Sequence, residues 1–290
     1  MRRFEYHEPR TLDEAVSLLS QFNGRASVLA GGTDLLVEIK EHLRWPACVI
    51  NIKRIPSLDQ LTYDENTGLH IGALVTVRTV ETSAVVREKY AGLAEATRQL
   101  GSIQIRNRAT VAGNVCRASP SADTLPPLIA DGAVVTIYGP AGERETLLED
   151  FFTGPGKTVL AGNEVLTKIS VPSPAPSTGK AYIKHGRRKA MELATVGVAV
   201  TLTLEGVVCR SARIVLGAVA PTPIRVPEAE DALCGRELEA EVIGEAAALA
   251  QAACRPISNV RSSADYRREM VNVLTGRAIA QAAVRARNST

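Results

Sequence analysis

The sequence predicts a mixed α+β protein with two α/β units and a smaller C-terminal domain. A chain of 290 residues is long enough for two or three packed units. Short apolar runs typical of strands alternate with helix-like segments as far as residue 171, and a proline-rich segment follows. Beyond it, two strand-like runs precede two long segments with helical character. We therefore expect units at 1–55, 56–175 and 176–290.

The first unit, 1–55, has the pattern of a β-α-β-α-β arrangement. Thr11 and Glu14 have the spacing of a capping box ahead of a helix that stops at Asn23-Gly24. Apolar runs at 27–30 and 48–52 predict strands, and 35–43 predicts a helix.

The second unit, 56–175, combines strands and helices. Residues 110–123 are polar, with glycine, serine and proline and only weak periodicity, so they predict a loop. Around this loop we expect strands at 68–73, 133–138 and 165–171, and helices at 79–90, 92–100 and 126–131.

The segment from Pro172 to Gly179 marks a domain boundary. It contains three prolines, two serines and a glycine in eight residues, which no helix or central strand accommodates. After it, we expect strands at 194–204 and 213–220, paired antiparallel, and helices at 239–253 and 264–283.

Composition limits the classes of function. Lysine and arginine total 34 against 31 acids, a net charge of +3 that gives no support to a nucleic-acid or membrane-surface role. No apolar run approaches the roughly 20 residues of a membrane span, and the N-terminus has no secretory pattern. We expect a cytoplasmic protein. The five cysteines and four histidines are scattered and form no sequence-local metal site.

The segment Leu29-Ala30-Gly31-Gly32-Thr33-Asp34-Leu35 is the first candidate ligand site. It joins a buried strand to a helix, and two glycines allow positive φ and close approach of a ligand. Exposed amides at such a turn suit a pyrophosphate. The alternative is a tight strand–helix turn capped by Thr33 or Asp34.

The segment Thr110-Val111-Ala112-Gly113-Asn114, followed by residues 118–123, is the second candidate. Its small residues and hydrogen-bonding side chains pack poorly as core but can surround a polar ligand. The alternative is a surface loop capping a helix that starts near Thr124. A third candidate is the basic segment 182–189, whose alternative is a solvated charge run.

Three familiar motifs are not supported. The segment 151–158 ends in Gly156-Lys157-Thr158 like a phosphate-binding P-loop, but Phe151 occupies the position of the first glycine. The chain contains neither the Gly-x-Gly-x-x-Gly of a Rossmann dinucleotide site nor the Gly-x-Ser-x-Gly elbow of a hydrolase.

Taken together, these loops resemble the FAD-binding subunits of the xanthine dehydrogenase and aerobic carbon monoxide dehydrogenase family. The resemblance covers nearly the whole chain in the right order. It rests on the segments 30–35, 104–114, 118–123, 164–166, 182–184 and 262–270.

The resemblance implies a flavin-binding fold of the vanillyl-alcohol oxidase (PCMH) type, with two α/β lobes around FAD and a C-terminal domain. The first loop, Leu29 to Leu35, would take the pyrophosphate, and the second, Thr110 to Asn114, would wrap the other side. The remaining family contacts fall on Leu100, Asp123, Leu166 and Lys184. Of these, Leu166 and Lys184 match positions near the isoalloxazine.

The family resemblance also implies partners. One subunit would carry two [2Fe-2S] clusters and another a molybdopterin cofactor, in a dimer of heterotrimers. Electrons would pass from the clusters through FAD to NAD or another acceptor. This agrees with the absence of any catalytic constellation in the chain, whose task would be to hold and tune the flavin. The substrate of the complex would be decided in the molybdenum subunit.

Two departures from the family pattern stand out. Ala112 replaces a frequent second glycine, a change small enough to leave FAD binding intact, and the cysteine-bearing insertion of the 4-hydroxybenzoyl-CoA reductase branch is missing. Two alternatives remain: a stand-alone flavoprotein oxidase, or a non-catalytic assembly protein that has lost its flavin.

Overall fold

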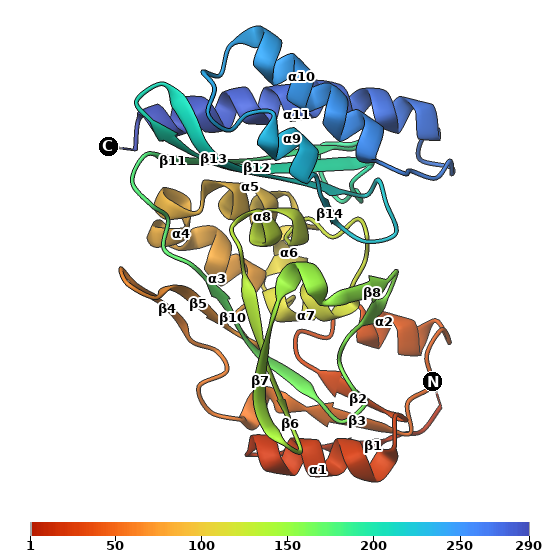
Figure 1. Cartoon of the computed structure of the whole chain (residues 1–290). Coiled ribbons are helices and arrows are strands. Elements are labelled where there is room, and N and C mark those ends of the chain that lie inside the picture. Colours follow the sequence, from red (N-terminus) through yellow and green to blue (C-terminus); the bar gives the residue numbers. More distant parts are fainter. Residues whose placement is uncertain (1, 290) are drawn as a thin grey trace.

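The computed structural model of the protein describes residues 2–289 (Figure 1). The first part is a three-stranded parallel sheet of order β1-β3-β2 with two helices. Thr11 caps α1 by accepting a hydrogen bond from the Glu14 amide, as the capping box predicts. The elements of this part are β1 (Glu5–His7), α1 (Leu12–Phe22), β2 (Ala26–Leu29), α2 (Leu35–Lys40), β3 (Cys48–Asn51) and the 3-10 helix η1 (Ile52–Arg54).

The second part is built on a five-stranded antiparallel sheet of order β4-β5-β10-β6-β7. Its strands are β4 (Leu61–Asp64), β5 (Gly68–Gly72), β6 (Val134–Gly139), β7 (Gly142–Leu147) and β10 (Val165–Val171), with a separate hairpin of β8 (Phe152–Gly154) and β9 (Lys157–Thr158). Its helices are α3 (Val77–Thr82), α4 (Ala84–Lys89), α5 (Ala91–Gln99), α6 (Ile103–Arg106), α7 (Val111–Arg117), α8 (Leu125–Ala130) and the 3-10 helix η2 (Leu148–Asp150).

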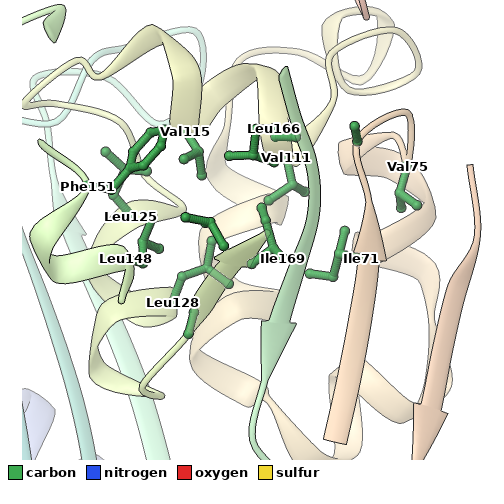
Figure 2. Close-up of a cluster of buried hydrophobic side chains, with 14 of the residues drawn as sticks. Ile71, Val75, Val111, Val115, Leu125, Leu128, Leu148, Phe151, Leu166 and Ile169 are labelled. Atoms are coloured by element: carbon green, nitrogen blue, oxygen red, sulfur yellow. The ribbon is translucent and has the colours of Figure 1, made fainter. Parts of the chain in front are cut away.

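The helix expected over 79–90 is two helices, because Ser83 ends α3 and caps α4 by accepting a hydrogen bond from the Val86 amide. The loop expected over 110–123 contains the short helix α7. Buried apolar side chains of α7, α8 and β10 share one core with the sheet, and Figure 2 shows Val111, Val115 and Leu128 within it.

The C-terminal part is a four-stranded antiparallel sheet of order β11-β12-β13-β14, covered on its outer face by α10 and α11 (Figure 1). Its elements are β11 (Thr178–His185), β12 (Val196–Glu205), β13 (Val208–Gly217), β14 (Ile224–Arg225), α9 (Pro227–Asp231), α10 (Ala240–Ala253) and α11 (Ala264–Arg287). The antiparallel pairing of the two predicted strands is confirmed.

The inner face of this sheet packs on α5 and α8 of the second part (Figure 1). Alternation along β11 places Tyr182 in the core shared with the second part and Ala181 in the core beneath α11. The predicted fold class, an α+β FAD-binding region joined to a C-terminal domain of antiparallel sheet and helices, is confirmed.

Candidate functional site

The first loop lies between the end of β2 at Leu29 and the start of α2 at Leu35. Gly32 has φ +78°, a conformation that strains any residue with a side chain. At Gly31, a Cβ atom would lie 2.3 Å from the carbonyl oxygen of Arg108. The two glycines therefore let the first loop turn tightly and lie directly against the backbone that precedes Thr110.

The amides of this loop are available to a ligand. Among residues 2–289, no backbone hydrogen bond is donated by the amides of Gly31, Gly32, Thr33 or Asp34. Asp34 occupies the N-cap position of α2, but its side chain makes no capping bond. The alternative prediction was a turn capped by Thr33 or Asp34, and the Asp34 cap is therefore wrong. Four consecutive amides without backbone partners form a set of donors suited to an anionic group.

The second loop is organised by Thr110, which caps α7. The Thr110 hydroxyl accepts from the Gly113 amide at 2.9 Å, and the Asn114 side-chain oxygen accepts from the Thr124 hydroxyl at 2.7 Å. Ala112, which stands where the family pattern often has a second glycine, is buried in the core. Its methyl group therefore packs against the core. The alternative of a plain surface loop ahead of Thr124 is wrong, because a helix occupies 111–117.

Two cations lie beside these loops, and the sequence reasoning did not single them out as site residues. Arg108 contributes the carbonyl that abuts Gly31, and its charge acts on Lys53 at η1. Burial, and then the Arg108 guanidinium, lower the pKa of the Lys53 ammonium. An anion placed nearby would stabilise the charged form of Lys53. Lys53 carried no sequence signal, whereas Arg108 lies in the segment 104–114 that carries the family resemblance.

Asp123 and Lys184, both predicted from the family resemblance, form a buried ion pair. The Lys184 ammonium donates to an Asp123 carboxylate oxygen at 2.8 Å and to the Gln99 carbonyl at 3.2 Å. The Tyr182 hydroxyl donates to the other Asp123 oxygen at 2.9 Å. Burial raises the pKa of the Asp123 carboxyl, although the Lys184 charge acts in the opposite direction. Tyr182 was not predicted as a site residue.

The structure joins the loop cluster to this ion pair through neighbouring residues. Thr124, which bonds Asn114, follows Asp123 directly, and Leu100 follows Gln99 at the end of α5. Leu166 is buried on β10 beside Val111 and Val115 of α7, as Figure 2 shows. The predicted residues therefore lie at the end of β2, on α2, α7, β10 and β11, and in the loops beside α2, α5, α7 and α8.

The basic segment 182–189 divides into two kinds of residue. Lys184 is buried in its ion pair, whereas Arg187 and Arg188 are exposed and pair with Glu192. The P-loop-like segment forms the β8–β9 hairpin with no following helix, which agrees with its rejection. In the described part of the chain, no group of histidine, cysteine and acidic residues could hold a metal ion. No helix of residues 2–289 is long and apolar enough to cross a membrane.

Comparison with known proteins decides the family. The family profile described as "FAD binding domain in molybdopterin dehydrogenase" matches residues 2–174, and "CO dehydrogenase flavoprotein C-terminal domain" matches residues 181–282. The chain belongs to this family of FAD-binding subunits. It is 36% identical to the carbon monoxide dehydrogenase medium chain of Hydrogenophaga pseudoflava, with 96% of both chains covered. It is 31% identical to the xanthine dehydrogenase FAD-binding subunit of Escherichia coli O157:H7, with 96% and 95% covered.

Solved structures of the family give the same result. The carbon monoxide dehydrogenase of Hydrogenophaga pseudoflava superposes with a TM-score of 0.94 at 37% identity, with 98% of each chain covered. The quinoline 2-oxidoreductase of Pseudomonas putida 86 gives 0.92 at 29% identity over 98% of both chains. The family prediction is confirmed, and with it the assignment to oxidoreductase subunits that bind FAD.

Proposed function

We propose that this chain is the electron-transfer subunit of a cytoplasmic molybdenum hydroxylase. When bound, FAD would supply a redox relay between the [2Fe-2S] clusters of one partner and NAD or another acceptor. The chain would assemble with an iron–sulfur subunit and a molybdopterin subunit into a dimer of heterotrimers. The names of its relatives support this, since they are medium or FAD-binding chains of dehydrogenases.

The residues that would hold FAD are those on the two loops and the adjoining ion pair. The free amides from Gly31 to Asp34 would donate to the pyrophosphate, and Lys53 and Arg108 would add positive charge. Leu29, Ala30, Thr33 and Leu35 complete the first wall, and Thr110 to Asn114 form the second. Leu100, Asp123, Leu166 and Lys184 would border the ring system.

Two features of the first loop support this proposal most strongly. Gly31 packs directly against the Arg108 carbonyl, and the amides from Gly31 to Asp34 donate no backbone hydrogen bond. A tight backbone turn whose four consecutive amides have no backbone partner fits a pyrophosphate. We further propose that 1–55 and 56–175 are the two lobes that hold the flavin and that 176–290 closes the site from the other side.

The test is the visible spectrum and FAD stoichiometry of the purified chain. We expect a yellow protein with about one FAD per chain that co-purifies with iron–sulfur and molybdenum subunits when all three genes are expressed. A colourless protein that takes up no added FAD would support the assembly-protein alternative. A flavoprotein that never associates with such partners would support the stand-alone oxidase.

A further inference from the structure

One cluster of buried polar groups lies outside the flavin loops and has no role in the proposed function. Among residues 2–289, five buried side-chain nitrogen or oxygen atoms lack a hydrogen-bond partner, and three belong to this cluster. They are the Thr195 hydroxyl, Arg261 Nη1 and Arg267 Nε. Thr195 is 2% exposed and Arg267 is 3% exposed. Buried donors without acceptors are costly, so their concentration in one place calls for a ligand.

Hydrogen bonds show that these three residues are neighbours. Arg267 Nη1 donates to the Ala218 carbonyl at 2.9 Å and to the Thr195 carbonyl at 3.4 Å. Asn259 Oδ1 accepts both from Arg267 Nη2 at 2.8 Å and from the Arg261 amide at 3.0 Å. Two backbone carbonyls and Asn259 thus hold the Arg267 guanidinium in place, and Asn259 also fixes the backbone amide of Arg261. Arg267 Nε and Arg261 Nη1 have no partner among residues 2–289.

The charge of the cluster is not balanced by the chain. Neither Arg261 nor Arg267 forms an ion pair with any carboxylate of residues 2–289, whereas the buried Lys180 and Lys184 each have an aspartate. Burial, together with the nearby Arg261, lowers the pKa of Arg267. Arginine nevertheless stays protonated in proteins, so a counter-charge from outside would stabilise this cluster.

We propose that Arg261, Arg267 and Thr195 bind an oxyanion, most simply a single carboxylate group. A guanidinium matches a carboxylate in a planar, charge-assisted geometry, and the threonine hydroxyl adds one donor. The carboxylate comes either from a small free acid or from an acidic side chain of a partner subunit. Ile257 and Val260, on the segment that carries Arg261, are 69% and 95% exposed and would lie at such a contact.

The position of this site connects it to the flavin region. The Thr195 amide donates to the carbonyl of His185, which follows Lys184, at 2.8 Å. The Ala218 amide donates to the Pro120 carbonyl at 2.7 Å, within the segment that leads to Asp123. Binding at Arg267 would therefore stabilise the ends of β12 and β13 that support the Asp123–Lys184 pair.

The first test is thermal unfolding of the full chain while sodium acetate replaces sodium chloride at constant ionic strength. We expect a saturable rise in Tm of ~2–4 °C. Thr195→Val and Arg267→Lys should abolish the rise. Thr275→Val is the matched control, because it also removes a buried hydroxyl without a partner, elsewhere on α11, and should keep the acetate response.

A second arm distinguishes the source of the carboxylate. If acetate has no effect on the isolated chain but Thr195→Val weakens recovery of the assembled complex and Thr275→Val does not, the partner supplies the group. If acetate has no effect and both variants assemble like the parent chain, the proposal is wrong and the cluster holds only water.

Discussion

Two lysine–aspartate pairs on the same strand provide the most informative comparison in this molecule. Lys180 and Lys184 lie four residues apart on β11, and their side chains are 5% and 7% exposed. Lys180 pairs with Asp131 at 3.0 Å and Lys184 with Asp123 at 2.8 Å. In each case the base comes from the C-terminal sheet and the acid from the region below it. By burial and charge alone, the pairs are nearly equivalent.

Their surroundings differ. Asp131 also accepts from the Thr201 hydroxyl at 2.7 Å, and the Lys180 ammonium lies 4.1 Å from the centre of the Tyr90 ring. The Lys184 pair adjoins the second loop proposed to hold FAD, since Thr124, next to Asp123, donates to Asn114. We infer that the Lys180 pair is purely structural and that the Lys184 pair serves both packing and flavin binding. The neighbours of a buried ion pair, and not its degree of burial, therefore indicate whether it has a role beyond packing.

In both pairs the acid and the base come from the same two regions of the chain. Every ion pair within residues 2–289 that joins the region before residue 176 to the region after it takes its acid from the first and its base from the second. The other acids are Glu95, paired with Arg285, and Glu149, paired with Arg213 and Arg225. Apolar contacts are also present, since Tyr182 belongs to the core of the second part.

The largest expected effect concerns the first loop, Leu29 to Leu35. Gly32→Val should abolish FAD retention, because the side chain strains a backbone at φ +78° and its Cβ would lie 2.8 Å from Leu29 Cδ1. The measurement is the ratio of bound flavin to protein after gel filtration. Gly24→Val is the control: Gly24 has φ +77° but open space around it, so the variant should lose about 1–3 kcal/mol of stability and keep its flavin.

The next effect tests the equivalence of the two pairs in folding. Lys180→Met and Lys184→Met each leave a buried aspartate without its partner, so each should lower the free energy of unfolding by about 3–5 kcal/mol. Urea denaturation of the flavin-free proteins measures this. If Lys180→Met costs less than a third of Lys184→Met, the two pairs are not structurally equivalent and the comparison fails.

A third prediction uses pH. Burial raises the folded-state pKa of Asp123 above its ordinary 3.8, so the folded state binds this proton more tightly than the unfolded state. The contribution of Asp123 to stability should therefore fall as pH rises from about 3.8 through the raised pKa. Measured as the difference in unfolding free energy between wild type and Asp123→Asn, the wild-type advantage should shrink with rising pH.

Glu164 provides the opposite case. The Arg144 guanidinium donates to it and lowers its pKa below 4.5, so its stabilisation is present above that value and is lost as pH falls through the lowered pKa. The wild-type advantage over Glu164→Gln should grow as pH rises. Equal signs for the two residues would show that burial does not dominate at Asp123.

The smallest effect is expected at the hydroxyl that supports Asp123. Tyr182→Phe removes one buried hydrogen bond, worth about 1 kcal/mol, and should weaken FAD binding a few-fold. Tyr90→Phe removes a buried hydroxyl that donates to the Pro172 carbonyl near the Lys180 pair, and should leave FAD binding unchanged. Equal FAD affinities for both variants and wild type would exclude Tyr182 from the site.

The sequence was sufficient where a local signal was strong. The cap at Thr11, the paired strands β12 and β13 and the helix α10 follow from capping residues and apolar periodicity. The helix α7 was not predicted, because its seven residues are too few to show helical periodicity. The strand β7 was not predicted, because it is a charged edge strand with no buried residue.

The sequence predicted several residues of the candidate site but not the contacts between them. Family resemblance identified both Asp123 and Lys184, yet 61 residues separate them and nothing local indicates that they pair. Tyr182 lies in a segment that carries the family resemblance, but nothing local indicates that its hydroxyl donates to Asp123. Lys53 carried no sequence signal, since its role depends on which strands and loops meet in the fold. The Gly31 contact with Arg108 is of the same kind, because only the folded chain shows why that position excludes a side chain.

The central claim, that the Lys184–Asp123 pair belongs to the flavin site and the Lys180–Asp131 pair does not, is tested most directly by FAD affinity. The dissociation constant of FAD is measured by quenching of flavin fluorescence for wild type, Lys180→Met and Lys184→Met at pH 7. Loss of a charge-assisted hydrogen bond should weaken binding roughly 10- to 100-fold in Lys184→Met and leave Lys180→Met within about twofold of wild type. Equal weakening in both variants, or none in Lys184→Met, would contradict the account.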